Sequence, residues 1–239
     1  MKFKGPLTEA TLLKRYFRFL VDVFVGPQQK RTLYCPNLGP LTYCDVLGSR
    51  VWFSKADRLS HGYLDVWELC EVDGGWLVCV NPNHADILVR EALAQDSLLE
   101  LVDFRFLQAV IVPNMGNGIE LLLKENGEQC FIHIEPVLAG DQKNNGFFPE
   151  ERGIGSSALY ELIALRESGH KAVLLYCVLH NGIRCIRPAD FVDPHYSNLL
   201  REAVGKGVEV LAYRVSINLQ EIKLDCRIPV LLSEDIILE

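Results

Sequence analysis

The cationic side chains of the first sixty residues are of the types that suit binding to a polyanion. This segment holds ten basic and four acidic residues, a net charge of +6, although the whole chain carries −7. A guanidinium group pairs bidentately with phosphate, and a glycine-containing turn lets backbone amides approach an anion. We therefore predict nucleic-acid contacts from Lys14, Arg15, Arg18, Asn37 and Gly39. The alternative is that Arg15 and Arg18 only cover a solvated strand face.

Three aromatic residues, Tyr16, Phe17 and Phe19, interleave with these cations. Aromatic rings on a protein surface can stack on nucleic-acid bases. However, alternate side chains of a strand point to opposite faces, so a strand over residues 16–25 must direct some of its side chains into the core. We expect these rings to belong mainly to the core.

Other motifs are weak in this sequence. The eight cysteines are scattered and form no Cys-x-x-Cys pair, which argues against a zinc site and favours buried cytosolic thiols. Residues 115–118 and 153–156 are rich in glycine but lack the glycine spacing and the lysine of a nucleotide-binding loop. We interpret both segments as turns.

A change of pattern near residue 82 divides the chain into two parts. Short strands are predicted before it at 16–25, 32–35, 50–54, 64–71 and 75–80, which is typical of a small barrel such as an oligonucleotide-binding fold. The elements predicted after it are a helix from Asn83, strands at 106–112, 118–123 and 130–134, a loop at 140–155, a helix at 156–167, a strand at 171–180, a helix at 193–205, and strands at 208–215 and 222–232. This order indicates an α/β sandwich.

Composition indicates an ordinary folded protein. Hydrophobic residues make up 49% and charged residues 23% of the 239 residues, so the chain can bury a core without disulfides. The apolar runs are too short to span a bilayer, and the first residues do not form a secretory signal. We expect a soluble, cytoplasmic protein. The negative net charge argues against a protein that coats nucleic acid non-specifically.

Several segments resemble, in matching order, those of the sugar fermentation stimulation protein A family of bacterial cytoplasmic DNA-binding proteins. They are RYFRFLVDV (15–23), CPNLGPLT (35–42), WEL (67–69), CVN (79–81), FP (148–149), AV leading to VLH (172–180), and GVEVLAY (207–213). The resemblance implies a mixed α/β protein with an oligonucleotide-binding (OB)-like barrel over residues 1–82 and a PD-(D/E)XK nuclease-like α/β sandwich over 83–239. It also implies DNA as a partner. The short apolar runs indicate no membrane, and a homodimer stays open.

The resemblance fails at the residues that carry nuclease chemistry. The family has an aspartate on one strand and Glu-x-Lys on the next, so that the carboxylates hold a divalent metal and the lysine helps to activate water. On this alignment Glu120 replaces the aspartate, His133 the glutamate and Glu135 the lysine. A later Arg-Gly-x-Lys segment of the family has become Ile-Gly-Ser-Ser at 154–157.

Three functions remain open. The first is a DNA-binding protein, a regulator linked to carbohydrate metabolism, with an inactive nuclease fold that requires no cofactor. The second is a metal-dependent nuclease in which Glu120, His133 and Glu135, with Glu91 from the preceding helix, bind Mn or Mg. The third is an interaction module without DNA affinity. We expect weak or absent hydrolysis in any case, and His180 either borders the altered site or has a structural role.

Overall fold

The strands of the amino-terminal part close into a barrel. The computed structural model describes residues 1–60, 62–110, 119–123 and 127–233. The strands of the amino-terminal part are β1 (Thr8–Tyr16), β2 (Leu20–Val25), β3 (Gln29–Tyr34), β4 (Arg50–Ser60), β5 (Tyr63–Val72) and β6 (Trp76–Cys79). Their order is β3-β2-β1-β4-β5-β6, and a parallel pairing of Tyr34 with Val66 joins β3 to β5. The closed five-stranded barrel of β1–β5 confirms the predicted OB-like domain.

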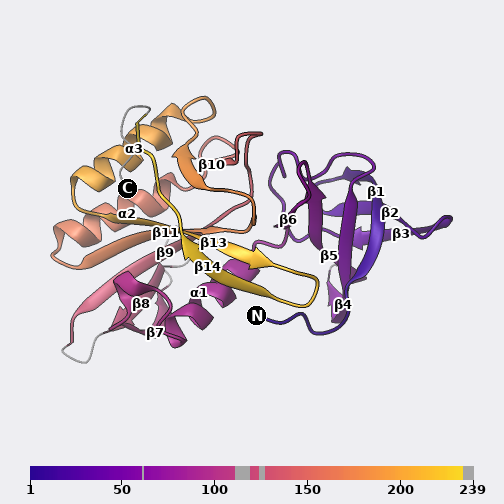
Figure 1. Ribbon diagram of the computed structural model, residues 1–239. Coiled ribbons are helices and arrows are strands. Elements are labelled where there is room, and N and C mark those ends of the chain that lie inside the picture. The colour runs from indigo at the N-terminus through magenta and orange to yellow at the C-terminus, as the bar shows by residue number, and fades with distance from the viewer. Residues whose placement is uncertain (61, 111–118, 124–126, 234–239) are drawn as a thin grey trace.

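Alternation along the barrel strands separates an apolar interior from an outer face. Val21 and Val23 of β2, Leu33 of β3 and Trp67 of β5 are fully buried inside. The intervening residues of β2 therefore point outward, and β2 and β3 lie on the side of the barrel away from the carboxyl-terminal part (Figure 1).

The predicted strand 16–25 is interrupted by a turn. Residues 17–19 connect β1 to β2, so that Tyr16 pairs with Leu20. Phe17 and Arg18 have φ angles of 51° and 64°, and this left-handed conformation costs free energy in a residue with a Cβ atom. The prediction of one strand was wrong because β-favouring side chains continue through the turn without a glycine or proline.

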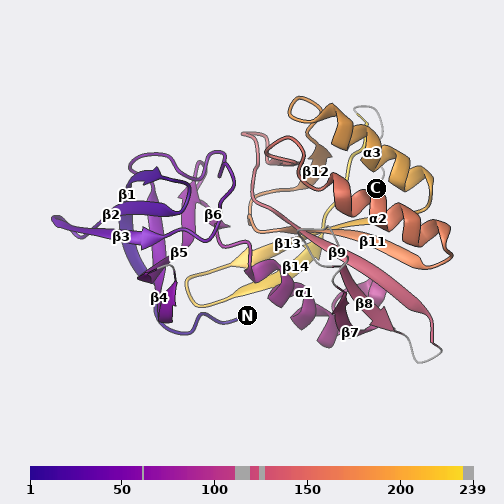
Figure 2. The same ribbon diagram turned by 180° about the vertical axis from the view of Figure 1, so that it is seen from behind.

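The carboxyl-terminal part is a six-stranded mixed sheet between helices. Its elements are α1 (His84–Ala94), a short 3-10 helix (Leu99–Leu101), β7 (Arg105–Val110), β8 (Ile119–Leu123), β9 (Gln129–Val137), β10 (Asn145–Phe148), α2 (Ser156–Glu167), β11 (Lys171–Val178), β12 (Cys185–Pro188), α3 (Pro194–Gly205), β13 (Glu209–Ile217) and β14 (Ile222–Arg227). The sheet order is β14-β13-β11-β9-β8-β7. Helices α2 and α3 cover one face, whereas α1 packs on the other (Figure 2). This arrangement confirms the predicted nuclease-like α/β sandwich.

One strand of a small second sheet lies within the segment predicted as a loop. Strand β10 falls inside residues 140–155 and pairs in parallel with β12. The prediction missed β10 because its four residues, Asn-Gly-Phe-Phe, resemble a turn, and its partner lies about forty residues further along the chain.

A continuous core joins the two parts of the molecule. Buried residues of the barrel and of α1 belong to one apolar cluster. At the edge of the barrel the amide of Cys79 donates to the carbonyl of Leu179 at 2.8 Å, and Val78 forms a bridge with His180. Lys2 likewise bridges to Glu221, so the amino-terminal segment runs beside β14 (Figure 1). Among the described residues, no helix is long and apolar enough to cross a membrane.

Candidate nucleic-acid interface

The guanidinium group of Arg15 forms hydrogen bonds with backbone carbonyl groups of the barrel. Its side chain is only 7% exposed. Nε donates to the carbonyl of Arg18 at 2.8 Å, Nη1 to that of Pro40 at 3.2 Å, and Nη2 to those of Asn37 at 2.7 Å and Gly39 at 2.8 Å. These bonds hold the β1–β2 turn against residues 37–40. Arg15 therefore shapes the predicted interface, and most of its donors are already occupied.

In the turn at Asn37–Gly39, the backbone amide of Gly39 also has a hydrogen-bond acceptor within the turn. The Gly39 amide donates to Asn37 Oδ1 at 2.7 Å, and a Cβ atom on Gly39 would lie 3.0 Å from the same oxygen. A larger residue at position 39 would therefore crowd this oxygen. The predicted anion-binding amide is engaged by a side chain of its own turn.

Arg18 is exposed and links the barrel to the carboxyl-terminal part. Its Nη1 and Nη2 atoms contact the two carboxylate oxygens of Glu151 at 3.1 and 3.3 Å, and Nη1 also donates to the Leu38 carbonyl. The hydrogen bond to Glu151 raises the pKa of Arg18. A phosphate at this position would have to compete with Glu151.

The third predicted cation, Lys14, lies on the outer face of β1 beside a network that the sequence did not reveal. Its Nζ atom is 5.0 Å from the centre of the Tyr16 ring. Asp22, only 3% exposed, accepts hydrogen bonds from Tyr16 Oη at 3.2 Å and Thr32 Oγ1 at 2.8 Å and pairs with Lys30 Nζ at 2.9 Å. Burial alone would raise the pKa of Asp22, but the bonds from Lys30, Thr32 and Tyr16 lower it.

Aromatic rings project from the same side of the barrel. Phe17 is 76% exposed and Phe19 and Phe24 are each 37% exposed. The Phe17 ring centre lies 5.6 Å from that of Tyr16 and 6.4 Å from that of Phe19. The expectation that Phe17 and Phe19 belong to the core was therefore wrong, because both lie in the turn, where strand alternation does not apply. We call Lys14, Tyr16, Phe24 and Lys30, with the turn residues Phe17 and Phe19, the β1–β3 face.

Two residues of the altered nuclease motif form a closed pair. His133 and Glu135 lie on the face of β9 toward α2 and α3, 0% and 4% exposed, with Nε2 and Oε2 3.2 Å apart. Tyr176 pairs with Glu135 across β9 and β11, and its hydroxyl lies 2.6 Å from that of Tyr196. No described residue accepts or donates a hydrogen bond at His133 Nδ1. The pair is sealed from solvent.

The other two predicted metal ligands do not join this pair in the described structure. The side chain of Glu120 lies outside the described residues; the backbone of β8 pairs Glu120 with Ile132, and Ile119 with His133. Glu91 lies on α1, which packs on the opposite face of the sheet, and its carboxylate binds the amino-terminal ammonium group of Met1. Within the described part of the chain, no three His, Cys, Asp or Glu side chains are arranged to hold a metal ion.

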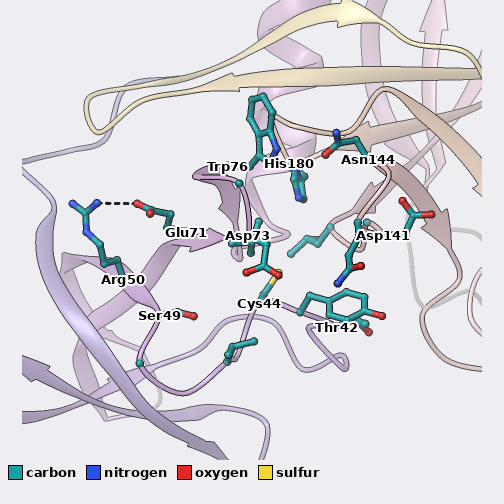
Figure 3. Close-up of a pocket in the computed structure, with 18 residues that line it drawn as sticks. Thr42, Cys44, Ser49, Arg50, Glu71, Asp73, Trp76, Asp141, Asn144 and His180 are labelled. Atoms are coloured by element: carbon teal, nitrogen blue, oxygen red, sulfur yellow. Dashed lines mark hydrogen bonds and ion pairs between the residues drawn. The ribbon is translucent and has the colours of Figure 1, made fainter.

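His180 borders a different feature, a cavity of about 710 Å³ between the two parts of the molecule (Figure 3). Burial lowers its pKa to about 4, and its Nδ1 accepts from the Gly182 amide at 3.0 Å. The ionisable residues of this cavity are mostly acidic (Glu71, Asp73 and Asp141), and its single arginine pairs with Glu71. This lining does not suit a phosphate.

The comparisons with known proteins agree with this architecture. Residues 13–80 match the SfsA N-terminal OB domain, and residues 83–221 match the sugar fermentation stimulation protein RE domain. The solved structure of Pyrococcus furiosus SfsA in complex with Ca²⁺ superposes with a TM-score of 0.86, at 20% identity, over 96% of this chain and 97% of that one.

Relatives with closer sequences carry the family name. A sugar fermentation stimulation protein homolog of Marinomonas sp. (strain MWYL1) is 37% identical over 97% of this chain and 91% of its own length. Another from Teredinibacter turnerae is 37% identical over 97% of this chain and its entire length. The chain belongs to the sugar fermentation stimulation protein family.

Proposed function

We propose that this chain binds DNA through the β1–β3 face, with a preference for unpaired bases, and that its nuclease-like domain does not cleave the DNA. The observation that carries the proposal is the exposure of Phe17 at the tip of a strained turn. An exposed ring provides a stacking surface that tolerates any base sequence. Its position beside the outer strands β2 and β3 and the β1–β2 turn matches the surface that OB folds use for oligonucleotides.

The charges of the β1–β3 face support the same role. Lys14 and Lys30 extend from neighbouring strands next to the aromatic rings, and Lys30 is 57% exposed. Because these ammonium groups have free donors facing water, they can approach phosphates without breaking the bonds that hold the barrel. Arg15 and Arg18 contribute by fixing the turn that presents Phe17.

Two features favour binding without hydrolysis. A water molecule that attacks a phosphate needs a metal or a base that the substrate can reach, whereas His133 and Glu135 are sealed beneath α2 and α3. The family's lysine is replaced by Glu135, so the site has also lost the cation that would offset charge in the transition state.

Fluorescence anisotropy with a labelled single-stranded oligonucleotide and with its duplex tests the proposal. We expect tighter binding of the single strand and weaker binding after Lys14→Ala/Lys30→Ala, with a decrease of about 1.4 in the slope of log affinity against log salt, about 0.7 for each lost phosphate contact. Lys223→Ala is the matched control, because Lys223 is also an exposed, carboxylate-paired lysine, 61% exposed on β14. Equal binding by the double variant and the parent would refute the proposal.

A metal-dependent nuclease is the second candidate, and the unpartnered Nδ1 atom of His133 favours it. The described residues supply only two donors there, His133 and Glu135, which do not complete a metal site. Calorimetric titration with Mn²⁺ decides between the candidates independently of cleavage. Stoichiometric Mn²⁺ binding that His133→Ala abolishes would support the nuclease, and absence of binding would support the DNA-binding protein.

The cellular role follows from the same proposal. A DNA-binding member of a family named for sugar fermentation would act as a regulator of carbohydrate metabolism. All eight cysteines are free, which suits the reducing cytoplasm. A homodimer is the assembly to test by light scattering.

A further inference from the structure

A second cavity between the two parts of the molecule has a different chemistry from the acidic one. It measures about 510 Å³, within the range of about 300–1,000 Å³ typical of small-molecule sites. The barrel contributes Thr42 and Tyr43, and the small β10–β12 sheet and the segment 231–233 line other parts of it.

The β10–β12 sheet places a cation beside an aromatic ring in this cavity. Phe147 of β10 and Arg187 of β12 are paired in register, and neighbouring strands present paired residues on the same face. Both are partly exposed and line the cavity; Phe148 and Pro188, one position further along, are buried, although Pro188 also borders the cavity. Arg187 and Phe147 thus lie side by side at the wall of the cavity.

Arg187 has no partner among the residues that the structure describes. Its Nε atom is buried and makes no hydrogen bond, and no ion pair of its guanidinium occurs among the described residues. Arg201 in the same cavity differs, because Asp190 binds it with two bonds of 2.8 Å and Nε donates to the Leu232 carbonyl. Because no described group accepts a hydrogen bond from Arg187, its guanidinium group has donors left for a ligand that binds at the cavity side of the group.

The acidic groups near Arg187 do not neutralise it. Asp190 is paired with Arg201. Glu150 accepts the Thr42 amide at 3.0 Å, and burial raises the pKa of its carboxyl group. The oxygens of Asp141 accept from the amides of Lys143 and Asn145 and from the Asn145 side chain. Asp141 keeps its negative charge, because these bonds lower the pKa of its carboxyl group. Arg187 is therefore the cation of this lining that no described carboxylate binds directly, and its guanidinium group can pair with an anion of low charge.

A flat apolar surface lies at the same cavity. Phe191 is 75% exposed, and its ring meets that of Phe147 at 65° with the centres 5.4 Å apart. An edge-to-face pair leaves a face of the exposed ring open for stacking.

We propose that this cavity binds a nucleoside monophosphate unit, with its phosphate on Arg187 and its base against Phe191. The unit is either a free nucleotide or the 5′-phosphorylated end of a strand. This inference rests on the proposed nucleic-acid function and adds to it a site lined by other residues than those of the β1–β3 face.

Calorimetry of the full chain with thymidine monophosphate, thymidine and inorganic phosphate tests the site. We expect the monophosphate to bind best, Arg187→Gln to weaken it roughly tenfold or more, and Phe191→Ala to remove the advantage of the monophosphate over phosphate. Arg184→Gln, which alters an exposed arginine three residues away that lines neither cavity, should change nothing. Thermal unfolding verifies that each variant is folded.

Two oligonucleotides of one sequence, with a 5′-phosphate or a 5′-hydroxyl, separate the sources of the ligand. A preference for the 5′-phosphate that Arg187→Gln abolishes identifies a strand end, and discrimination confined to the free nucleotide identifies a metabolite. Unchanged monophosphate binding by folded Arg187→Gln, or no binding at millimolar ligand, would overturn the inference. The 5′-hydroxyl strand reports the β1–β3 face separately, because it should lose affinity in Lys14→Ala/Lys30→Ala and not in Arg187→Gln.

Discussion

Two carboxylates of this protein are buried to nearly the same extent but differ in the polar groups around them. Asp22 on the barrel is 3% exposed and Glu135 in the nuclease-like domain is 4% exposed. Asp22 has hydroxyl donors on one oxygen and an ammonium group, itself largely in water, on the other. Glu135 faces His133, whose second ring nitrogen has no partner among the described residues.

The difference shows which region remains available to a ligand. Around Asp22 the fold meets the polar needs of the carboxylate and still leaves lysines and aromatic rings at the surface. Around Glu135 the polar groups are enclosed, so that a phosphate would first have to open the packing beneath α2 and α3. Accessibility, more than the identity of the ionisable residues, therefore separates the surface that we propose for binding from the enclosed pair at the altered motif.

The largest effect is expected when the enclosed pair is broken. His133→Leu leaves Glu135 buried without its partner and should lower the free energy of unfolding by about 3–5 kcal/mol, measured by urea denaturation at pH 7. His133→Leu/Glu135→Met replaces both groups and should recover most of that loss. A single variant as stable as the parent would show that Glu135 reaches water or another partner.

The next effect concerns the exposed ring of the β1–β3 face. Phe17→Ala should weaken binding of a single-stranded oligonucleotide by about 1–3 kcal/mol, since that is the range for one stacked base, with little change in duplex binding. Leu99→Ala, an equally exposed apolar truncation at 78% exposure on the other part of the molecule, serves as the control in the same anisotropy assay. Similar losses for both strand types would contradict the preference for unpaired bases.

The sequence predicted the framework better than the interface. Helix α2 occupies the predicted residues 156–167, and the two architectures were identified from their strand and helix order together with the family resemblance. Hydrophobic periodicity and turn residues act over a few positions, so they report these elements directly. Strand β10 was missed because its partner is distant in the chain.

The side-chain roles depended on contacts that no local pattern encodes. Arg15 has the chemistry to bind phosphate, yet four carbonyl groups from two turns take up its donors. Asp22 stands in an apolar run, and only the pairing of β1, β2 and β3 brings Tyr16, Lys30 and Thr32 to it. The sequence shows that a cationic side chain can bind an anion, but the fold determines whether its donors are free or already bonded within the protein.

Lowering the pH should reduce the contribution of the buried Asp22 carboxylate to the stability of the barrel. The folded-state pKa of Asp22 is lowered, so its bonds stabilise the fold above the unfolded-state pKa of about 3.9, and this contribution is lost as the pH falls below that value. Asp22→Asn should cost about 1 kcal/mol at pH 7 and less at pH 3, as measured by urea denaturation. Asp73→Asn alters an exposed carboxylate and should show no such difference. An Asp22→Asn loss that stays constant from pH 7 to pH 3 would contradict this account.

The smallest expected effect tests the ion pair that connects the two regions. Glu151 occupies the guanidinium of exposed Arg18, so Glu151→Gln should release a cation beside Phe17. We expect single-stranded DNA to bind about two- to threefold more tightly at low salt, and the slope against log salt to steepen by about 0.7 for one added phosphate contact. The stability of the fold should change by less than about 1 kcal/mol, as is usual for exposed pairs.

A double-mutant cycle assigns this gain to Arg18. In Arg18→Ala/Glu151→Gln the added affinity and the steeper slope should both disappear, whereas a general reduction of negative charge would leave them in place. If Glu151→Gln tightens binding equally with and without Arg18, the turn does not contact the DNA backbone, and Lys14 and Lys30 are the cations of the β1–β3 face that do.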